Sequence, residues 1–152
     1  ETPFIAEDLL QLRHLERLRY SFVDQASDIK RKVISLLDQV FPEYEQLFSD
    51  TFGKSSTELL MNYTLPEEIL EVDTNELVNL LMKASNGRLG KSRALNKADQ
   101  LRESALNTFG ITIGTDVFKL QIQLLLEQIE LIEKHLSEIE QVMIEIIAKS
   151  TF

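Results

Sequence analysis

A short basic segment is the part of this sequence whose residue types and spacing could do chemistry. Residues 83–102 contain one acidic residue, Asp99, and six basic residues: Lys83, Arg88, Lys91, Arg93, Lys97 and Arg102. Gly87 and Gly90 permit a tight loop before Ser92, where we expect a helix to begin. The backbone amides at the start of a helix attract anions. We therefore expect these six basic residues to contact the phosphates of a nucleic acid.

Residues 83–102 have two other possible interpretations besides contact with nucleic-acid phosphates. The run Gly87-x-x-Gly90-Lys91-Ser92 is similar to the end of a nucleotide-binding loop. Such a loop needs a glycine where Ser85 stands, and a strand before it, so nucleotide binding is disfavoured. The basic residues could instead only offset residues 42–82, which contain nine acidic residues and one basic residue.

The rest of the sequence predicts no catalytic residues and no metal site. Cysteine is absent, which excludes thiol catalysis and cysteine–zinc sites. His14 and His135 have no second ligand-type residue at a repeating helical spacing. The many carboxylates suit helix surfaces and helix N-termini, and packing is the expected role of Tyr20, Tyr44 and Tyr63.

Composition favours an all-α fold. The chain has 152 residues, of which 43% are hydrophobic, with only 5 glycines and 3 prolines. So few chain-breaking residues argue against sheet-based folds, which need many turns. No run of about 18 apolar residues predicts a membrane span, and no signal peptide is visible. We therefore expect a cytoplasmic protein without a membrane partner, and its net charge of −9 argues against general binding of polyanions.

The last part of the chain, residues 116–152, predicts a long helix. Apolar residues recur there at alternate spacings of four and three, which is typical of a coiled coil. This C-terminal seam consists of Phe118, Ile122, Leu125, Ile129, Ile132, Leu136, Ile139, Met143 and Ile146. Gly114 and Thr115 precede it as a break and an expected N-cap.

Residues 1–42 predict a second long helix, which Pro42 ends. Its N-terminal seam consists of Leu12, Leu15, Arg19, Phe22, Ala26, Ile29, Val33, Leu36 and Val40, with Arg19 as the one polar member. Because neither helix can bury its seam alone, we expect an antiparallel coiled-coil pair. A Lys30–Glu133 ion pair would suit its register, and residues 43–115 would form an inserted helical subdomain.

The last helix has more apolar residues than one partner helix needs. The additional residues are Leu120, Leu124, Leu126, Leu131, Val142, Ile144 and Ile147. They could pack against the insert within one chain, or they could form a surface for self-association. We expect a homo-oligomer in which the seam from Ile122 to Ile146 contributes to the interface, and the sequence leaves open whether this seam pairs within or between chains.

The insert contains several helix start signals. Ser55 with Glu58, Thr64 with Glu67, and Asp73 with Glu76 have the spacing of capping boxes. A final helix of the insert is expected over about residues 92–109, with Gly110 as the residue that ends it.

The order of motifs along the whole chain resembles one protein family. The motifs are LRHLERLRYSFVD at residues 12–24, ISLLDQVFPEY at 34–44, FGK at 52–54, ASNGRLG at 84–90 and LLLEQI at 124–129. They resemble the middle region of bacterial insertion-sequence transposases of family one hundred and ten, which are related to pilin-gene invertases. These enzymes combine a RuvC-like domain that has a DEDD set of carboxylates with a second domain that contains a serine.

The resemblance implies a helical spacer between two catalytic domains of an oligomeric recombinase that a structured RNA guides on DNA. The family's catalytic carboxylates precede the matched region and its serine follows it, so no catalytic residue is carried onto this chain. No cofactor is expected in this segment, since the divalent metal would belong to the nuclease domain. The alternative is a stand-alone helical module for protein–protein interaction without nucleic-acid binding.

Overall fold

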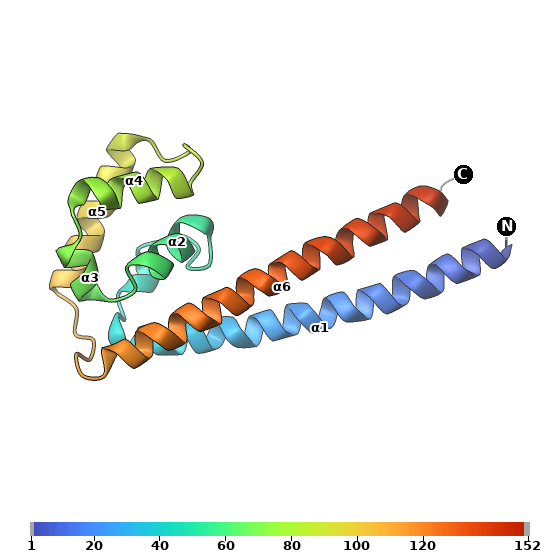
Figure 1. The fold of residues 1–152 in the computed structure, drawn as a ribbon, viewed down its shortest axis with the longest axis horizontal. Helices are drawn as coiled ribbons and strands as arrows, with labels where there is room; N and C mark the ends of the chain where they lie inside the picture. Colours follow the sequence, from blue (N-terminus) through green and yellow to red (C-terminus); the bar gives the residue numbers. More distant parts are fainter. Residues whose placement is uncertain (1, 151–152) are drawn as a thin grey trace. The chain divides into compact units, whose positions relative to one another are not determined.

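The computed structural model describes residues 2–150 and confirms the prediction of an all-α fold (Figure 1). No strand occurs among residues 2–150. The α-helices are α1 (Thr2–Val40), α2 (Lys54–Asn62), α3 (Pro66–Glu71), α4 (Thr74–Ala84), α5 (Lys91–Leu106) and α6 (Thr115–Ser150), and a short 3₁₀ helix, η1 (Tyr44–Gln46), follows α1.

The contacts within the chain define two compact units. The first unit combines Glu1–Lys30 with Glu127–Phe152, and the second unit is Arg31–Leu126. Both boundaries lie inside long helices, so α1 and α6 each contribute one stretch to each unit.

In the first unit, the two helical stretches run antiparallel (Figure 1). Ser150 Oγ donates a hydrogen bond of 2.5 Å to the Asp8 carboxylate. The rings of Phe22 and His135 lie 5.4 Å apart between centroids. These two pairs place the beginning of α1 beside the end of α6 within this unit. The expected Lys30–Glu133 ion pair stays a prediction.

The seam residues of the first unit are covered to different degrees along the helices. Ala26 and Ile29 of α1 are buried, as are Ile129, Ile132 and Ile139 of α6. The other seam positions of this unit are only half-buried: Leu12, Leu15, Arg19, Phe22, Leu136, Met143 and Ile146. The C-terminal seam of this unit therefore packs within the chain, and its coiled-coil geometry stays a prediction.

Arg19 interrupts the N-terminal seam without burying its charge. Its Nε donates a hydrogen bond of 2.8 Å to Glu16 Oε1, one helical turn earlier. This hydrogen bond lowers the pKa of the Glu16 carboxyl below its usual value. The long arginine stem can thus cover apolar neighbours while its guanidinium stays in contact with water.

The second unit contains most of the fully buried side chains. Its core joins the end of α1, the shorter helices and the beginning of α6 through Val33, Leu37, Phe41, Tyr44, Leu59, Leu60, Ile69, Leu77, Leu81, Leu101 and Ile122. α5 packs against α3 and α4. Ala94, Ala98 and Ala105 are buried on α5, and such small side chains allow neighbouring helices to approach closely.

A buried hydroxyl pair lies in this core. Tyr44 Oη is 2.8 Å from Ser56 Oγ and donates to the Ser56 carbonyl oxygen at 3.2 Å. Both residues are at most 1% exposed. Burial raises the pKa of the Tyr44 hydroxyl well above its ordinary value, because the charged form would lose its hydration.

The helix starts and ends of the insert differ in part from the sequence prediction. Asp73 is the N-cap of α4, at the predicted position, but its side chain makes no capping hydrogen bond. The N-cap of α3 is Leu65, one residue after the predicted cap Thr64, and its backbone N–H donates to Glu68 Oε1 at 3.1 Å. The cap of α2 is Gly53 rather than Ser55. α5 ends at Leu106, three residues before the predicted end at residue 109.

No helix in the described part of the chain is long and apolar enough to cross a membrane.

Candidate nucleic-acid interface and exposed apolar surfaces

The structure divides the six predicted phosphate ligands into two groups. Lys83, Arg88, Lys91 and Arg93 are exposed and surround the connection between α4 and α5. We refer to these four residues as the basic tip. Lys97 and Arg102 lie further along α5 and are only partly exposed, because their charged groups contact other parts of the second unit.

The connection that presents the basic tip is a hydrogen-bonded turn. Asn86 and Gly87 have positive φ angles of 55° and 81°, a conformation that glycine and asparagine adopt more readily than other residues. Ser85 Oγ donates to the Met82 carbonyl at 2.9 Å and accepts from the backbone N–H of Leu89 at 3.0 Å. Arg88 is therefore held in a defined turn between the two helices.

The start of α5 has an electrostatic environment that favours an anion. Gly90 is its N-cap and offers no side-chain hydrogen bond, and the first turn contains no acidic residue. The first amide groups of a helix have no partner within the helix and form its positive end. Lys91 and Arg93 add two more positive charges at this end. A bound phosphate would compensate both the free amides and the charges.

Lys97 has a structural role in the second unit. Its Nζ donates a hydrogen bond to the carbonyl oxygen of Leu47, the residue that ends η1. The same ammonium group lies 5.1 Å from the centre of the Phe48 ring, within the range of a cation–π interaction. This lysine therefore connects α5 to the segment after η1.

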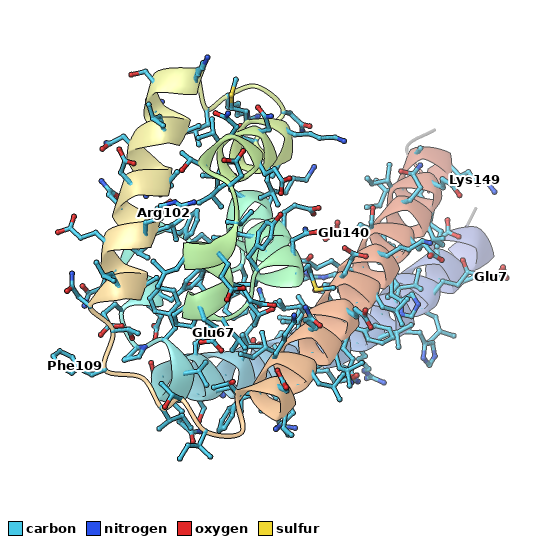
Figure 2. All side chains as sticks on the ribbon, turned by 60° about the vertical axis from the view of Figure 1, so that its left-hand side comes forward. Glu7, Glu67, Arg102, Phe109, Glu140 and Lys149 are labelled. Carbon is cyan, nitrogen blue, oxygen red and sulfur yellow. The ribbon has the colours of Figure 1, made fainter. Side chains whose placement is uncertain are left out.

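Arg102 has a similar role at the end of α3. Its guanidinium donates to the carbonyl oxygens of Leu70 and Val72, and Val72 is the C-cap of α3. A positive group at a helix C-terminus satisfies free carbonyl groups and compensates the helix dipole. Arg102 Nε is buried without a hydrogen-bond partner in the part of the chain that the structure describes. Figure 2 labels Arg102 on α5.

The additional apolar residues of α6 are mostly exposed. Six of the seven have between 43% and 58% of their surface accessible to solvent, and only Leu126 is buried. Those in the first unit are Leu131, Val142, Ile144 and Ile147. On α1, the exposed large apolar residues of the same unit are Leu9, Leu10, Leu18, Tyr20 and Val23. We refer to these nine residues as the outer apolar residues.

Neither histidine belongs to a group of possible metal ligands in the described part of the chain. His14 is exposed on α1, and His135 is half-buried beside Phe22. Among the described residues, no cluster of three or more histidine, aspartate or glutamate side chains could hold a metal ion. Asp38 and Glu45 form a carboxyl pair, in which a hydrogen bond between the two side chains raises the pKa of exposed Glu45.

One exposed surface was missed by the sequence analysis. Between α5 and α6, large apolar side chains lie at the surface, with Phe109 93% and Ile113 86% exposed. The sequence does contain a signal for this surface. Apolar residues follow the buried alanines of α5, and the spacing of these apolar residues does not have the period of a helix. The predicted helix over 92–109 includes part of this segment, so the prediction did not identify an exposed surface there.

No family model, curated protein or solved structure matches this chain in the three comparisons with known proteins.

Proposed function

We propose that this chain is the helical spacer and oligomerisation segment of a cytoplasmic DNA transposase of insertion-sequence family one hundred and ten. The order of its motifs supports this proposal, because it resembles the region between the catalytic domains of that family. The antiparallel helix pair of the first unit also suits a spacer. The segment itself supplies no catalytic residue and no cofactor in this proposal.

The basic tip is the observation that best supports contact with DNA or structured RNA. Its four cations are exposed, and two of them lie in the first turn of α5, whose amides also attract phosphate. Contact through this small surface is compatible with a net charge of −9, because exposed charges further away than about 10 Å are largely screened at physiological salt. Lys97 and Arg102 have structural roles and are not included in this interface.

Self-association rests on the outer apolar residues. An isolated pair of helices leaves them in contact with water, which is unfavourable by roughly 25 cal/mol for each Å² of apolar surface. A second copy that covers part of these residues would give a four-helix arrangement. The seam from Ile129 to Ile146 would then stabilise each protomer, and the outer residues would form the interface.

The test of phosphate contact is a binding titration with duplex DNA and with a structured RNA at several salt concentrations. If four cations contact phosphates of duplex DNA, the logarithm of the affinity should fall with the logarithm of salt with a slope of roughly −3 to −4. The triple variant Arg88→Glu, Lys91→Glu, Arg93→Glu should abolish this binding. A matched variant, Lys32→Glu with Lys54→Glu, changes exposed charges elsewhere in the second unit and should retain most of it.

The alternative function is a protein–protein interaction module without nucleic-acid binding. The outer apolar residues and the acidic net charge favour it. The same titration separates the two functions. Binding that the triple variant leaves unchanged contradicts the role of the basic tip. If neither nucleic acid binds the wild-type chain even at low salt, the interaction module becomes the better description.

A further inference from the structure

The segment between α5 and α6 displays large apolar side chains in a way that the proposed function does not use. The exposed fractions are 72% for Leu106, 93% for Phe109, 45% for Ile111 and 86% for Ile113. We refer to residues 106–113 as the apolar loop. Figure 2 shows the Phe109 side chain projecting away from the neighbouring helices.

The backbone of the apolar loop is attached to the end of α1. The amide of Ile111 donates to the carbonyl oxygen of Gln39 at 2.8 Å. The Glu43 carboxylate accepts hydrogen bonds from Thr108 Oγ1 and from the amide of Phe109, the latter at 3.4 Å. A side chain presented from a fixed backbone loses little conformational entropy on binding, so the loop is pre-organised for a contact.

Acidic residues lie beside the apolar loop. Glu43 contacts it directly, Glu103 is in the last turn of α5, and Asp116 is in the first turn of α6. Asp38 precedes Gln39 and forms the carboxyl pair with Glu45. These charges would repel nucleic acids and anionic lipids, and they favour an occupant that combines apolar and positively charged side chains.

The basic tip at the other end of α5 has this combination. Leu89 is half-buried within it, and Leu95, one helical turn after Lys91, is 44% exposed. α5 has 16 residues, a length of roughly 24 Å, so the two ends of this helix cannot meet within one chain. The dipole of α5 adds to the charge difference between the two ends of this helix, because its positive N-terminus is at the basic tip and its negative C-terminus is at the apolar loop.

We propose that the apolar loop of one copy of this chain docks on the basic tip of a second copy. Phe109 and Ile113 would contact Leu89 and Leu95, and the Phe109 ring would also face an arginine of the tip, which is a favourable cation–π arrangement. The carboxylates beside the loop would face Lys91 and the other cations. The contact joins two different surfaces, so it is heterologous and can extend to further copies.

Because the tip is also the proposed phosphate site, a nucleic acid and the apolar loop compete for the same cations. The head-to-tail contact goes beyond the proposed function and does not depend on it, since each can hold without the other. A short duplex DNA should dissociate head-to-tail assemblies if both proposals are correct.

The test uses two variants, each of which lacks one half of the contact. The loop variant is Phe109→Ser with Ile113→Ser, and the tip variant is the triple glutamate variant of the basic tip. Sedimentation equilibrium gives the average mass of each variant alone and of an equal mixture at low salt. In the mixture, an intact loop meets an intact tip, so its average mass should exceed the mean of the two separate samples. High salt should remove this excess.

As the protein concentration rises, the average mass of the wild-type chain should exceed that of either variant. Both variants leave the first unit unchanged, so association through the outer apolar residues appears equally in both and forms the baseline. If each variant alone is a monomer and the mixture still forms a larger species, only the proposed self-association of the first unit is contradicted. The matched control for the loop is Leu70→Ser, since Leu70 is also exposed, and it should behave like the wild type.

Two results overturn the head-to-tail contact. The first is a mixture whose mass equals the mean of its components. The second is a wild-type chain with the same mass as the loop variant at every concentration, in which case the apolar loop has another occupant. Circular dichroism checks that both variants fold. If the double serine variant does not, Leu106→Ser replaces it, because Leu106 is 72% exposed and its loss should weaken the same contact.

Discussion

Gly110 lies against the backbone of Val40 more closely than any other residue type would permit. A Cβ atom at position 110 would be 2.1 Å from the Val40 carbonyl oxygen and 2.5 Å from its carbonyl carbon. The neighbouring hydrogen bond from Ile111 to Gln39 holds the two segments at this distance. This close approach connects the end of α1 to the segment before α6.

Gly110→Ala should lower the free energy of unfolding by about 2 kcal/mol, because the backbone must move to accommodate the methyl group. Urea denaturation followed by circular dichroism measures this loss. Gly90→Ala is the matched control, since a Cβ atom at position 90 has no neighbour within 4 Å, and its cost, which arises because alanine is a poorer N-cap than glycine, should stay below about 1 kcal/mol. Equal stability of the two variants would contradict the close approach.

Tyr44→Phe should destabilise the second unit at neutral pH by about 1 kcal/mol, because the Ser56 groups lose a buried partner. The cost should shrink in alkali. Burial raises the pKa of the folded Tyr44 hydroxyl above its ordinary value of 10.0, so the unfolded chain releases this proton first. Wild-type stability therefore falls as pH rises above about 10, and the phenylalanine variant lacks this contribution.

Urea denaturation of both proteins at about pH 8 and about pH 11 measures the difference. Other groups ionise in both proteins and cancel in the comparison. A stability difference that stays constant over this range would show that the Tyr44 hydroxyl ionises equally in the folded and unfolded states.

Arg102→Met should reduce stability by about 1–3 kcal/mol, since the carbonyl groups of Leu70 and Val72 lose their donor. Nucleic-acid affinity of the folded variant should not change. Lys91→Met should show the opposite pattern, with stability within about 0.5 kcal/mol of wild type and weaker binding of DNA. Paired urea denaturation and fluorescence anisotropy titrations measure both quantities. A loss of affinity in Arg102→Met as large as in Lys91→Met would place Arg102 in the interface.

Ile139→Asp and Ile144→Asp should separate folding from association in the first unit. Ile139 is 7% exposed, so an aspartate there buries a charge and should cost several kcal/mol. Ile132, which is also 7% exposed, should respond in the same way. Ile144 is 58% exposed, so its aspartate variant should fold and lose only self-association.

Circular dichroism and sedimentation velocity distinguish these outcomes. Ile144→Asp should keep the helical signal of the wild type and sediment more slowly. Association that Ile144→Asp and Ile147→Asp both leave intact would exclude the outer apolar residues as the interface.

The sequence alone determined the helical class and the two long helices. A period of 3.5 residues from Phe118 to Ile146 is a local property of the chain, and it predicts the long helix without knowledge of the partner. It predicts the covered side less accurately, since Leu126 is buried and the seam residue Leu125 is only half-buried. Pro42 and Gly114 mark the helix boundaries for equally local reasons, since each restricts or frees its own backbone. Local reasoning was less accurate within the insert, where a one-residue shift at Thr64 and Leu65 depends on how α3 packs.

Only the tertiary structure decided which basic residues face solvent. Lys97 contacts the carbonyl of Leu47, 50 residues earlier, and Arg102 contacts that of Val72, 30 residues earlier. These contacts depend on how α5 lies against its neighbours, and the spacing of charges along the chain contains no information about them. The register of the helix pair and the display of Phe109 have the same origin. Both features result from contacts between segments that are distant in the sequence, such as the contact of Gly110 with Val40. No local sequence pattern encodes such contacts.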